Sequence, residues 1–207
     1  MFAGIVQGIG TITAIEPLGF GRRLTIDAAT LGLDDVTIGD SIAVNGACLT
    51  VTRKNMRAFS VDVSAETLDK TAGLDARGDV NLEKSMRLGD RVDGHLVSGH
   101  IDGIGIVRTM EPFGESWLLT IGVPENLARF VAVKGSVTVS GVSLTVNRVE
   151  DVQREGCRCS INLIPHTIAV TTLRNLKAGD RVNLEIDMIA RYVERMLARG
   201  AGRPESL

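Results

Sequence analysis

The chain has 207 residues, of which 44% are hydrophobic and 23% charged, with a formal net charge of −2. This is enough for one large domain or two small ones, and it argues against a nucleic-acid partner, because phosphate binding needs a concentrated basic surface. No apolar stretch approaches the roughly 20 residues that span a bilayer, the N-terminus lacks the charged lead of a signal peptide, and three cysteines fit a reducing compartment, so we expect a cytoplasmic protein without a membrane partner.

The first glycine-rich run of the chain, Gly8-Ile9-Gly10, returns 95 residues later as Gly103-Ile104-Gly105. The same offset aligns two later segments without a gap: Leu24-Thr25-Ile26 with Leu119-Thr120-Ile121, and Leu49-Thr50-Val51 with Leu144-Thr145-Val146. It then grows to 102, where the segment 80–83 aligns with the segment 182–185. The period exceeds the ~20–50 residues of solenoid repeats, so it predicts two similar small domains in tandem.

Residues 41–51 of the first copy carry a hairpin signal. Asn45-Gly46 lies between two apolar-rich runs, and both residues of such a turn must accept positive φ. Ser140-Gly141 lies at the matching place in the second copy. The segments 60–63 and 80–83 alternate as half-buried strands do. Short strands with closely spaced turns favour a closed antiparallel barrel, which leaves no exposed edge.

Only the end of the chain has a strong helical pattern. Between residues 188 and 199 the apolar side chains form one stripe: Ile189, Tyr192, Val193, Met196 and Leu197. This helix either packs on its own barrel or contacts another subunit, and its position outside the repeat favours the second alternative. We therefore expect a first domain at 1–88, a second domain at 89–187, and a C-terminal oligomerisation helix and tail at 188–207.

Matching positions at which the two copies differ are candidates for specialised roles. The differences are Ile5 against His100, Cys48 against Ser143, Glu66 against His166, Asp62 against Asn162, and Gly39 against Lys134. A histidine that titrates near neutrality suits proton transfer. This makes His100 the better acid–base candidate, whereas His95 lies in the predicted linker.

Serine and cysteine side chains in these segments have both structural and chemical interpretations. Ser143 is either a strand serine bonded to the backbone or a site residue, and no Gly-x-Ser-x-Gly elbow surrounds it. Cys48 is either a small buried apolar residue or part of the site wall. Cys157 and Cys159 have no second pair of ligands at a suitable spacing, so we expect no metal. No nucleotide-binding motif is present, so no cofactor is indicated.

Five ordered motifs resemble those of the riboflavin synthase family and extend from residue 1 to about residue 199. They are Met1-Phe2-Ala3-Gly4-Ile5-Val6, the segment Val44-Asn45-Gly46-Ala47-Cys48-Leu49-Thr50-Val51-Thr52, Gly94-His95-Leu96-Val97-Ser98-Gly99-His100, Gly141-Val142-Ser143-Leu144-Thr145-Val146, and Ile164-Pro165-His166-Thr167.

The resemblance implies an all-β fold of tandem, duplicated six-stranded antiparallel Greek-key barrels with a C-terminal α-helix, usually assembled as a homotrimer. It also implies a transferase that works without a cofactor. Two molecules of 6,7-dimethyl-8-ribityllumazine would give riboflavin and 5-amino-6-(D-ribitylamino)uracil by transfer of a four-carbon unit. The site would lie between the first barrel of one subunit and the second barrel of its neighbour. Orienting two identical substrates in this way can supply roughly 7–11 kcal/mol of a barrier.

Candidate site residues follow from the same motifs. The resemblance implies a first half-site lined by Phe2, Gly4, Ile5, Val6, Ser41, Cys48, Leu49, Thr50, Asp62, Val63, Ser64, Ala65, Glu66 and Thr67. It implies a second lined by Gly99, His100, Ile101, Lys134, Ser143, Leu144, Thr145, Asn162, Leu163, Ile164, Pro165, His166 and Thr167. His100 and Ser143 would act in proton transfer or addition at C7 of the lumazine, with Cys48 and Asp187 assisting. Ser140 stands where some family members have an acid, which leaves a role for an acid there open.

Two other functions stay open at this point. A non-catalytic lumazine- or flavin-binding protein of the same fold would keep one half-site and let the other drift, whereas the candidate residues His100, Lys134, Ser143 and Thr145 all persist in the second copy. A structural module of duplicated barrels would make these motifs accidental. Association with a lumazine-making enzyme also stays open.

Overall fold

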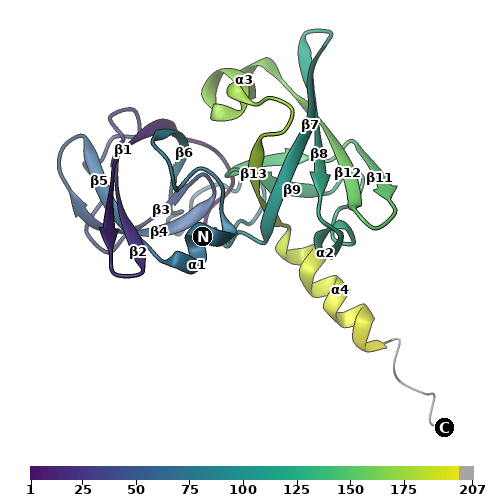
Figure 1. The fold of residues 1–207 in the computed structure, drawn as a ribbon, viewed down its shortest axis with the longest axis horizontal. Coiled ribbons are helices and arrows are strands. Elements are labelled where there is room, and N and C mark those ends of the chain that lie inside the picture. The colour runs from purple at the N-terminus through teal and green to yellow at the C-terminus, as the bar shows by residue number, and fades with distance from the viewer. Residues whose placement is uncertain (201–207) are drawn as a thin grey trace.

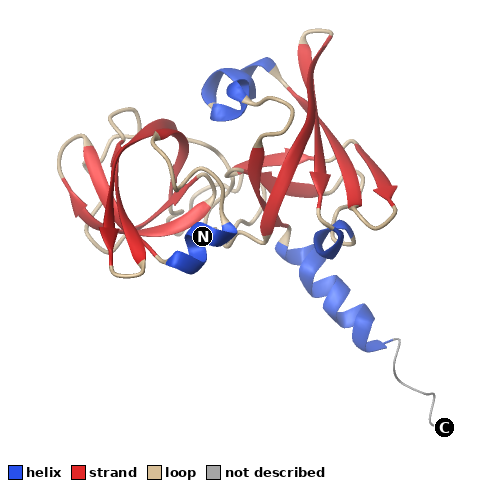
Figure 2. Cartoon of the chain, viewed as in Figure 1, coloured by secondary structure: helices blue, strands red, loops and turns tan. Residues whose placement is uncertain are grey.

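The computed structural model describes the backbone of residues 1–200 and the side chains of residues 1–198. Two β-sheet units lie side by side, and a C-terminal helix extends from the second unit (Figures 1 and 2). Within residues 1–200, no helix has both the length and the apolar character that a membrane crossing requires. The expected all-β duplicated fold with a C-terminal helix is confirmed, and residues 201–207 of the predicted tail lie outside the described residues.

The first unit is a closed antiparallel barrel. The expected turn at Asn45-Gly46 joins two of its strands, and both turn residues have positive φ, 47° and 84°. A short helix, α1 (Ala65–Lys70), follows the fifth strand. The strands run in the order β1-β2-β5-β4-β3-β6 and are β1 (Gly8–Leu18), β2 (Gly21–Asp27), β3 (Ser41–Val44), β4 (Ala47–Lys54), β5 (Ala58–Val63) and β6 (Gly78–Lys84).

The second unit repeats this topology with one strand divided. Its sheet order is β10-β9-β13-β7-β8-β12-β11. The strands are β7 (Gly103–Phe113), β8 (Ser116–Val123), β9 (Ser136–Val139), β10 (Val142–Thr145), β11 (Arg148–Val152), β12 (Gly156–Leu163) and β13 (Arg181–Ile186). The helical elements of this half are α2 (Glu125–Ala128), α3 (Pro165–Val170), the 3-10 turn η1 (Thr172–Asn175) and α4 (Met188–Gly200).

The expected six strands of the second barrel are therefore seven, because the counterpart of β4 is interrupted between β10 and β11. At the interruption, the side-chain Oδ1 of Asn147 accepts the backbone N–H of Asn162 at 2.8 Å. A side chain thus replaces the backbone carbonyl that would continue the ladder. Thr52, the matching residue of the first copy, lies at a register shift within β4 that leaves that strand continuous. The second sheet is consequently open between its two edge strands, which follow one another in the chain.

Each unit has its own apolar core, because alternate side chains of its strands point inward. In β2, Leu24 and Ile26 are fully buried, and the matching Leu119 and Ile121 of β8 are also fully buried. The two sets belong to separate clusters of packed side chains. The match between the two copies is thus chiefly a match of core positions, which explains why the same fold forms twice.

The two units meet across an approximate twofold arrangement, in which matching residues make matching contacts. The carboxamide of Asn81, on β6, donates to the carbonyl of Ser140 at 2.9 Å. That of Asn183, the matching residue of β13, donates to the carbonyl of Asn45, also at 2.9 Å. Both carboxamides belong to nearly fully buried residues. Each unit therefore binds the tight turn of the other.

The opening segments of the two copies pair with each other at the centre of this arrangement. The backbone N–H of Phe2 donates to the carbonyl of Val97 at 2.8 Å, and the N–H of Val97 donates to the carbonyl of Phe2 at 3.0 Å. These residues occupy the same position in the repeat. Both are buried, in a small cluster with Ala43 and Cys48. The pairing brings the start of each copy to the other unit.

Candidate active site

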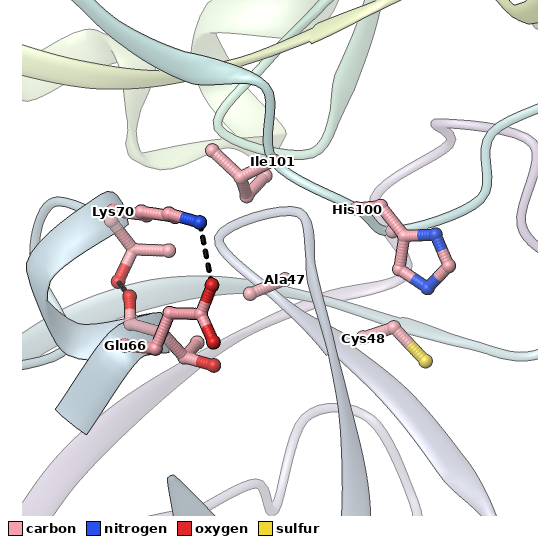
Figure 3. A pocket seen from close by; sticks show the side chains of 9 residues that line it. Ala47, Cys48, Glu66, Lys70, His100 and Ile101 are labelled. Carbon is pink, nitrogen blue, oxygen red and sulfur yellow. Dashed lines mark hydrogen bonds and ion pairs between the residues drawn. The ribbon is translucent and has the colours of Figure 1, made fainter. Parts of the chain in front are cut away.

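The first barrel has an open cavity whose empty space, open solvent included, is about 480 Å³. In Figure 3, Cys48 and His100 lie at one end and the Glu66–Lys70 pair at the other. The cavity combines the β3–β4 turn, α1 and a segment from the start of the second copy. Its lining residues are Ala47, Cys48, Glu66, Thr67, Lys70, Thr71, Gly99, His100 and Ile101.

Helix α1 carries a charged pair that lines this cavity, and its first turn is capped. The side chain of Ser64 accepts the backbone N–H of Thr67 at 3.1 Å, which satisfies one of the free N–H groups at the helix start. Glu66 and Lys70 are one helical turn apart, and their side chains bond at 2.6 Å. This bond lowers the pKa of the Glu66 carboxyl. The cavity therefore offers both a carboxylate and an ammonium group to a polar ligand.

Gly99 brings the second copy's opening segment against Cys48. Its carbonyl accepts the backbone N–H of Cys48 at 2.8 Å, and its φ is +81°. A Cβ at this position would lie 2.5 Å from the Cβ of Cys48, so only glycine allows the approach. His100 and Ile101, expected in the second half-site, instead line the cavity beside Cys48 of the first barrel.

Gly4 makes the reciprocal contact on the second barrel. Its carbonyl accepts the backbone N–H of Ser143 at 2.7 Å, and a Cβ at Gly4 would lie 2.7 Å from the Cβ of Ser143. Val6 packs against the core of the second unit. Gly4 and Val6, expected in the first half-site, thus lie against the second barrel, and the exposed Ile5 between them lines a separate cavity with Glu83. The opening segments are exchanged between the half-sites.

Ser143 is bonded to a histidine that comparison of the two copies does not select. Nδ1 of His95 lies 2.7 Å from Oγ of Ser143, and Nε2 of His95 lies 3.2 Å from Oγ1 of Thr138. Burial lowers the pKa of His95, against the opposing effect of the negative charge of Asp187. A neutral imidazole between two hydroxyl groups can accept a proton from one while donating to the other.

The signal for His95 was present in the sequence but lay outside the repeat. The offset of 95 matches Leu96 to Met1, so His95 stands one position before the first matched pair. It lies instead within the motif Gly94-His95-Leu96-Val97-Ser98-Gly99-His100. Its contact with Ser143 joins residues far apart in the chain, which neither composition nor spacing could reveal.

Several candidate residues point into the cores rather than toward a cavity. The side chains of Leu49 and Val63 are buried in the first core, and those of Leu144 and Leu163 in the second. Phe2 is buried at the contact between the barrels. The motifs contain both faces of each strand, and alternation sends every second residue inward. These five side chains therefore support the half-sites from behind.

Other candidates make contacts outside the Cys48 cavity. Asp62 forms a two-point ion pair with Arg23 on the outside of the barrel at 2.6 and 2.7 Å, which lowers the pKa of Asp62. Ser41 lines a separate cavity beside β3. Asp187 accepts the backbone N–H of Ile189 at 2.8 Å at the start of α4. None of these contacts brings its residue to Cys48.

The remaining candidates lie at exposed or half-buried positions of their elements. Lys134 is exposed in a left-handed turn and donates its backbone N–H to the carbonyl of Val146. Ala65 opens α1, and Thr50 and Thr145 point outward from β4 and β10. The others lie at the end of β12 or at the start of α3: Asn162, Ile164, Pro165, His166 and Thr167. They match residues 62–67 of the first copy.

Cys157 and Cys159 are buried in the core of the second unit, and burial raises the pKa of the Cys159 thiol to about 12. Among the described side chains, no group of three or more His, Cys, Asp or Glu residues could hold a metal ion.

Ser140, which stands where some family members have an acid, lies at the contact between the barrels. Its backbone carbonyl accepts a hydrogen bond from the side chain of Asn81.

Comparison with known proteins gives the same two-part organisation. The family described as "Lumazine binding domain" matches residues 3–85 and again residues 98–187. The chain is 42% identical over 199 residues to the riboflavin synthase of Photobacterium phosphoreum, covering 95% of this chain and 89% of the relative. It is 44% identical over 206 residues to the riboflavin synthase of Mycobacterium bovis, covering 98% and 100% of the two chains. The riboflavin synthase of Bacillus subtilis is 40% identical over 200 residues, covering 95% and 90%.

Solved structures of LumP have the same fold. The complex with 6,7-dimethyl-8-(1'-D-ribityl) lumazine superimposes with a TM-score of 0.78 at 26% identity, over 90% of this chain and 99% of that chain. The riboflavin complex gives a TM-score of 0.79 at 28% identity over the same shares. The chain contains two lumazine-binding repeats, and it is more than 40% identical to the riboflavin synthases of Photobacterium phosphoreum and Mycobacterium bovis over nearly its whole length. It therefore belongs to the riboflavin synthase family.

Proposed function

We propose that the chain catalyses the conversion of two 6,7-dimethyl-8-ribityllumazine molecules into riboflavin and 5-amino-6-(D-ribitylamino)uracil by four-carbon transfer. The observation that carries this proposal is the pair of half-sites with the same backbone and different reactive groups. One has Cys48 and His100 in a cavity, and the other has Ser143 bonded to His95. Two related but unequal half-sites fit two identical substrates that must play unequal parts.

The Ser143–His95 pair suits removal of a proton from the C7 methyl group of one lumazine. As the methyl C–H bond breaks, its proton passes to Oγ of Ser143 while the serine proton passes to Nδ1 of His95. The electron pair stays on the lumazine ring system, and the imidazole becomes a cation. Before the transfer, Thr138, which is fully buried, accepts from the Nε2–H of the neutral ring and so leaves Nδ1 free to take the serine proton. A positioned base of this kind contributes about 10²–10⁴-fold to a rate.

Residues of the first barrel suit the acceptance of the second lumazine. Cys48 and His100 line one end of the cavity, and Glu66 and Lys70 line the other (Figure 3). The charged pair can bind hydroxyl groups of a ribityl chain through charge-assisted hydrogen bonds. His100 is exposed, so its ring is available to donate to the ring system of the substrate. Asp187 assists from the other barrel by its charge on His95.

We also propose that the complete site forms between subunits of a homo-oligomer, a homotrimer by the family resemblance. Helices α1 and α3, which carry matching half-site residues, lie on opposite sides of the molecule in Figure 1. The two half-sites of one chain therefore do not face each other, and two bound substrates must be brought together by a neighbouring chain.

Helix α4 supports this assembly. Two ion pairs tie its polar side to the second unit: Arg191 to Asp102 at 2.7 Å and Arg129 to Glu194 at 3.1 Å. The apolar stripe points away from the barrel, and its side chains are roughly half to three-quarters exposed: Ile189, Tyr192, Val193, Met196 and Leu197. An exposed apolar stripe of this kind marks a protein contact.

The proposed domain limits remain 1–88, 89–187 and 188–207. The three free cysteines favour a cytoplasmic location.

The test is anaerobic incubation of the purified protein with 6,7-dimethyl-8-ribityllumazine, followed by absorbance. Formation of one riboflavin for every two lumazines consumed is the expected result. Lumazine consumption without riboflavin, or no consumption, would contradict the proposal.

A second candidate, a non-catalytic lumazine or flavin carrier, is favoured by one observation. The structural neighbours include LumP complexes with the lumazine, riboflavin and flavin mononucleotide. Tight binding of the lumazine without conversion would select this function.

A further inference from the structure

We infer that Glu83 and Glu185 are positioning residues, each of which holds the backbone segment that places the reactive side chain of the opposite barrel. The inference deepens the proposed function and rests on it for the roles of Ser143 and Cys48. It assigns a positioning task to two buried carboxylates that do not line the Cys48 cavity and that bond backbone N–H groups rather than reactive side chains.

Glu83 lies on β6 of the first barrel and is 4% exposed. Its two carboxylate oxygens accept the backbone N–H groups of Ala3 at 2.7 Å and Gly4 at 3.1 Å. Charged acceptors make stronger hydrogen bonds than neutral ones, and a buried carboxylate needs such partners to offset its loss of hydration. The segment 3–4 is therefore fixed to the first barrel at two consecutive peptide groups.

The same two residues hold the reactive pair of the second barrel. The carbonyl of Ala3 accepts the backbone N–H of His95 at 3.2 Å, and the carbonyl of Gly4 accepts the backbone N–H of Ser143 at 2.7 Å. Glu83 thus acts on both members of the Ser143–His95 pair through a single peptide segment. Hydrogen bonds in such a chain polarise one another, so a charge at one end strengthens the bonds at the other.

Glu185, the matching residue of β13, repeats the arrangement in the opposite direction. Its carboxylate accepts the backbone N–H groups of Ser98 at 2.6 Å and Gly99 at 3.0 Å, and the hydroxyl of Ser98 at 2.7 Å. The carbonyl of Gly99 accepts the backbone N–H of Cys48 at 2.8 Å. The second barrel therefore positions Cys48 of the first, and the two carboxylates form a crossed pair.

This crossed arrangement predicts effects that a general loss of stability would not produce. Substitution of Glu83 should change the positions of His95 and Ser143 and not that of Cys48, although Glu83 and Cys48 belong to the same barrel. Substitution of Glu185 should change the position of Cys48 and not that of His95, although Glu185 and His95 belong to the same half of the chain. Each substitution is thus in one barrel, and the side chain that it displaces is in the other.

The experiment compares E83Q and E185Q in the full chain, with the exposed Glu115→Gln variant, in the β7–β8 loop, as matched control. Three readouts are measured: kcat and KM for lumazine conversion, the ring NMR signals and titration of His95, and the alkylation rate of Cys48 by iodoacetamide. Cys157 and Cys159 are buried, so Cys48 is the thiol that reacts in the native protein. The NMR and alkylation readouts need no substrate, so they remain valid if the wild type fails to convert the lumazine, a result that would contradict the proposed function alone.

The expected result is a loss of kcat on the order of 10- to 100-fold in E83Q, since small displacements of reacting groups have effects of this size. In the same variant the His95 titration shifts and Cys48 alkylation stays at the wild-type rate. In E185Q the alkylation rate changes and the His95 titration stays. Equal changes of both probes in both variants, or an unchanged His95 in E83Q, would overturn the inference. If E83Q does not fold, Glu83→Asp, which retains the charge on a shorter side chain, is held to the same expectation.

Discussion

Nδ1 of His95 lies 2.7 Å from Oγ of Ser143, although the two residues belong to different motifs and are separated by 48 positions in the chain. The bond joins a residue of the connecting segment to a residue of β10. It gives the serine, which has no acidity of its own near neutral pH, a partner that can take its proton.

The pair predicts non-additive losses of activity. His95→Gln and Ser143→Ala should each lower kcat by about 10²–10⁴-fold, because each removes one half of the proton path. The double variant should lose little more than the worse single variant, since residues that act as a unit are not additive. Steady-state kinetics on the three variants provides the check.

Ser160→Ala is the matched control for this series. It removes a hydroxyl from the same barrel that bonds Thr120 at 3.3 Å, away from His95. Its kcat should stay close to that of the wild type. Multiplicative losses in the double variant would show that Ser143 and His95 act independently.

The pH dependence of kcat should carry the titration of His95. Burial lowers the pKa of His95 from the ordinary value of 6.5, and only the neutral imidazole can accept a proton. Activity should therefore fall as the pH drops, with a midpoint below 6.5. The His100→Gln variant should keep this acid limb, whereas His95→Gln should lose it. A wild-type midpoint at or above 6.5 would exclude His95 as the base.

Glu83 should make the protein less stable as the pH rises. Burial raises the pKa of Glu83 from 4.5 to about 7, so the folded state binds this proton more readily than the unfolded state does, and the carboxylate with its two backbone N–H partners prevails above about pH 7. The stabilisation is complete below pH 4.5 and is lost as the pH rises through about 7, with an upper limit of about 3 kcal/mol. The Tm of E83Q, relative to that of the wild type, should therefore increase between pH 4.5 and 7. A constant difference in Tm across this range would refute the assignment.

The exposed stripe of α4 should determine the oligomeric state. Met196→Glu together with Tyr192→Glu places charges on the stripe, so the oligomer should dissociate to monomers and lose activity as the half-sites of neighbouring chains separate. Analytical ultracentrifugation measures the result. Arg195→Gln, an exposed change on the same helix, serves as the control. An intact oligomer in the charged variant would rule out this contact.

Much of the fold could be predicted from the sequence, because the repeat conserves core positions and turns. Leu24 and Ile26 match Leu119 and Ile121, and all four are fully buried. The interruption of the second barrel could not be predicted in this way. It depends on the side chain of Asn147 replacing a backbone acceptor, and a sequence comparison treats that position as one more difference between the copies.

The sequence proposes residues for the candidate site but not their arrangement. The motifs select Cys48, Ser143 and His100 as candidates and place His100 in the second half-site, whereas in the structure His100 lies beside Cys48 of the first barrel. The reason is the exchange of the opening segments: Gly99 bonds Cys48 of the first barrel, and Gly4 bonds Ser143 of the second. Periodicity reports the local face of a strand and contains no information about which of two similar barrels a connecting segment joins.

The exchange of the opening segments also sets an order of events during translation. Chains leave the ribosome N-terminus first, and domains generally fold in that order. The strands of the first barrel are complete at Lys84, but its cavity lacks the wall formed by Gly99, His100 and Ile101 until these residues emerge. Meanwhile, residues 1–6 must wait for Ser143 and the second core. Neither proposed half-site can therefore be finished before Ser143 has been synthesised, so we expect a chain that ends after Lys84 to lack both.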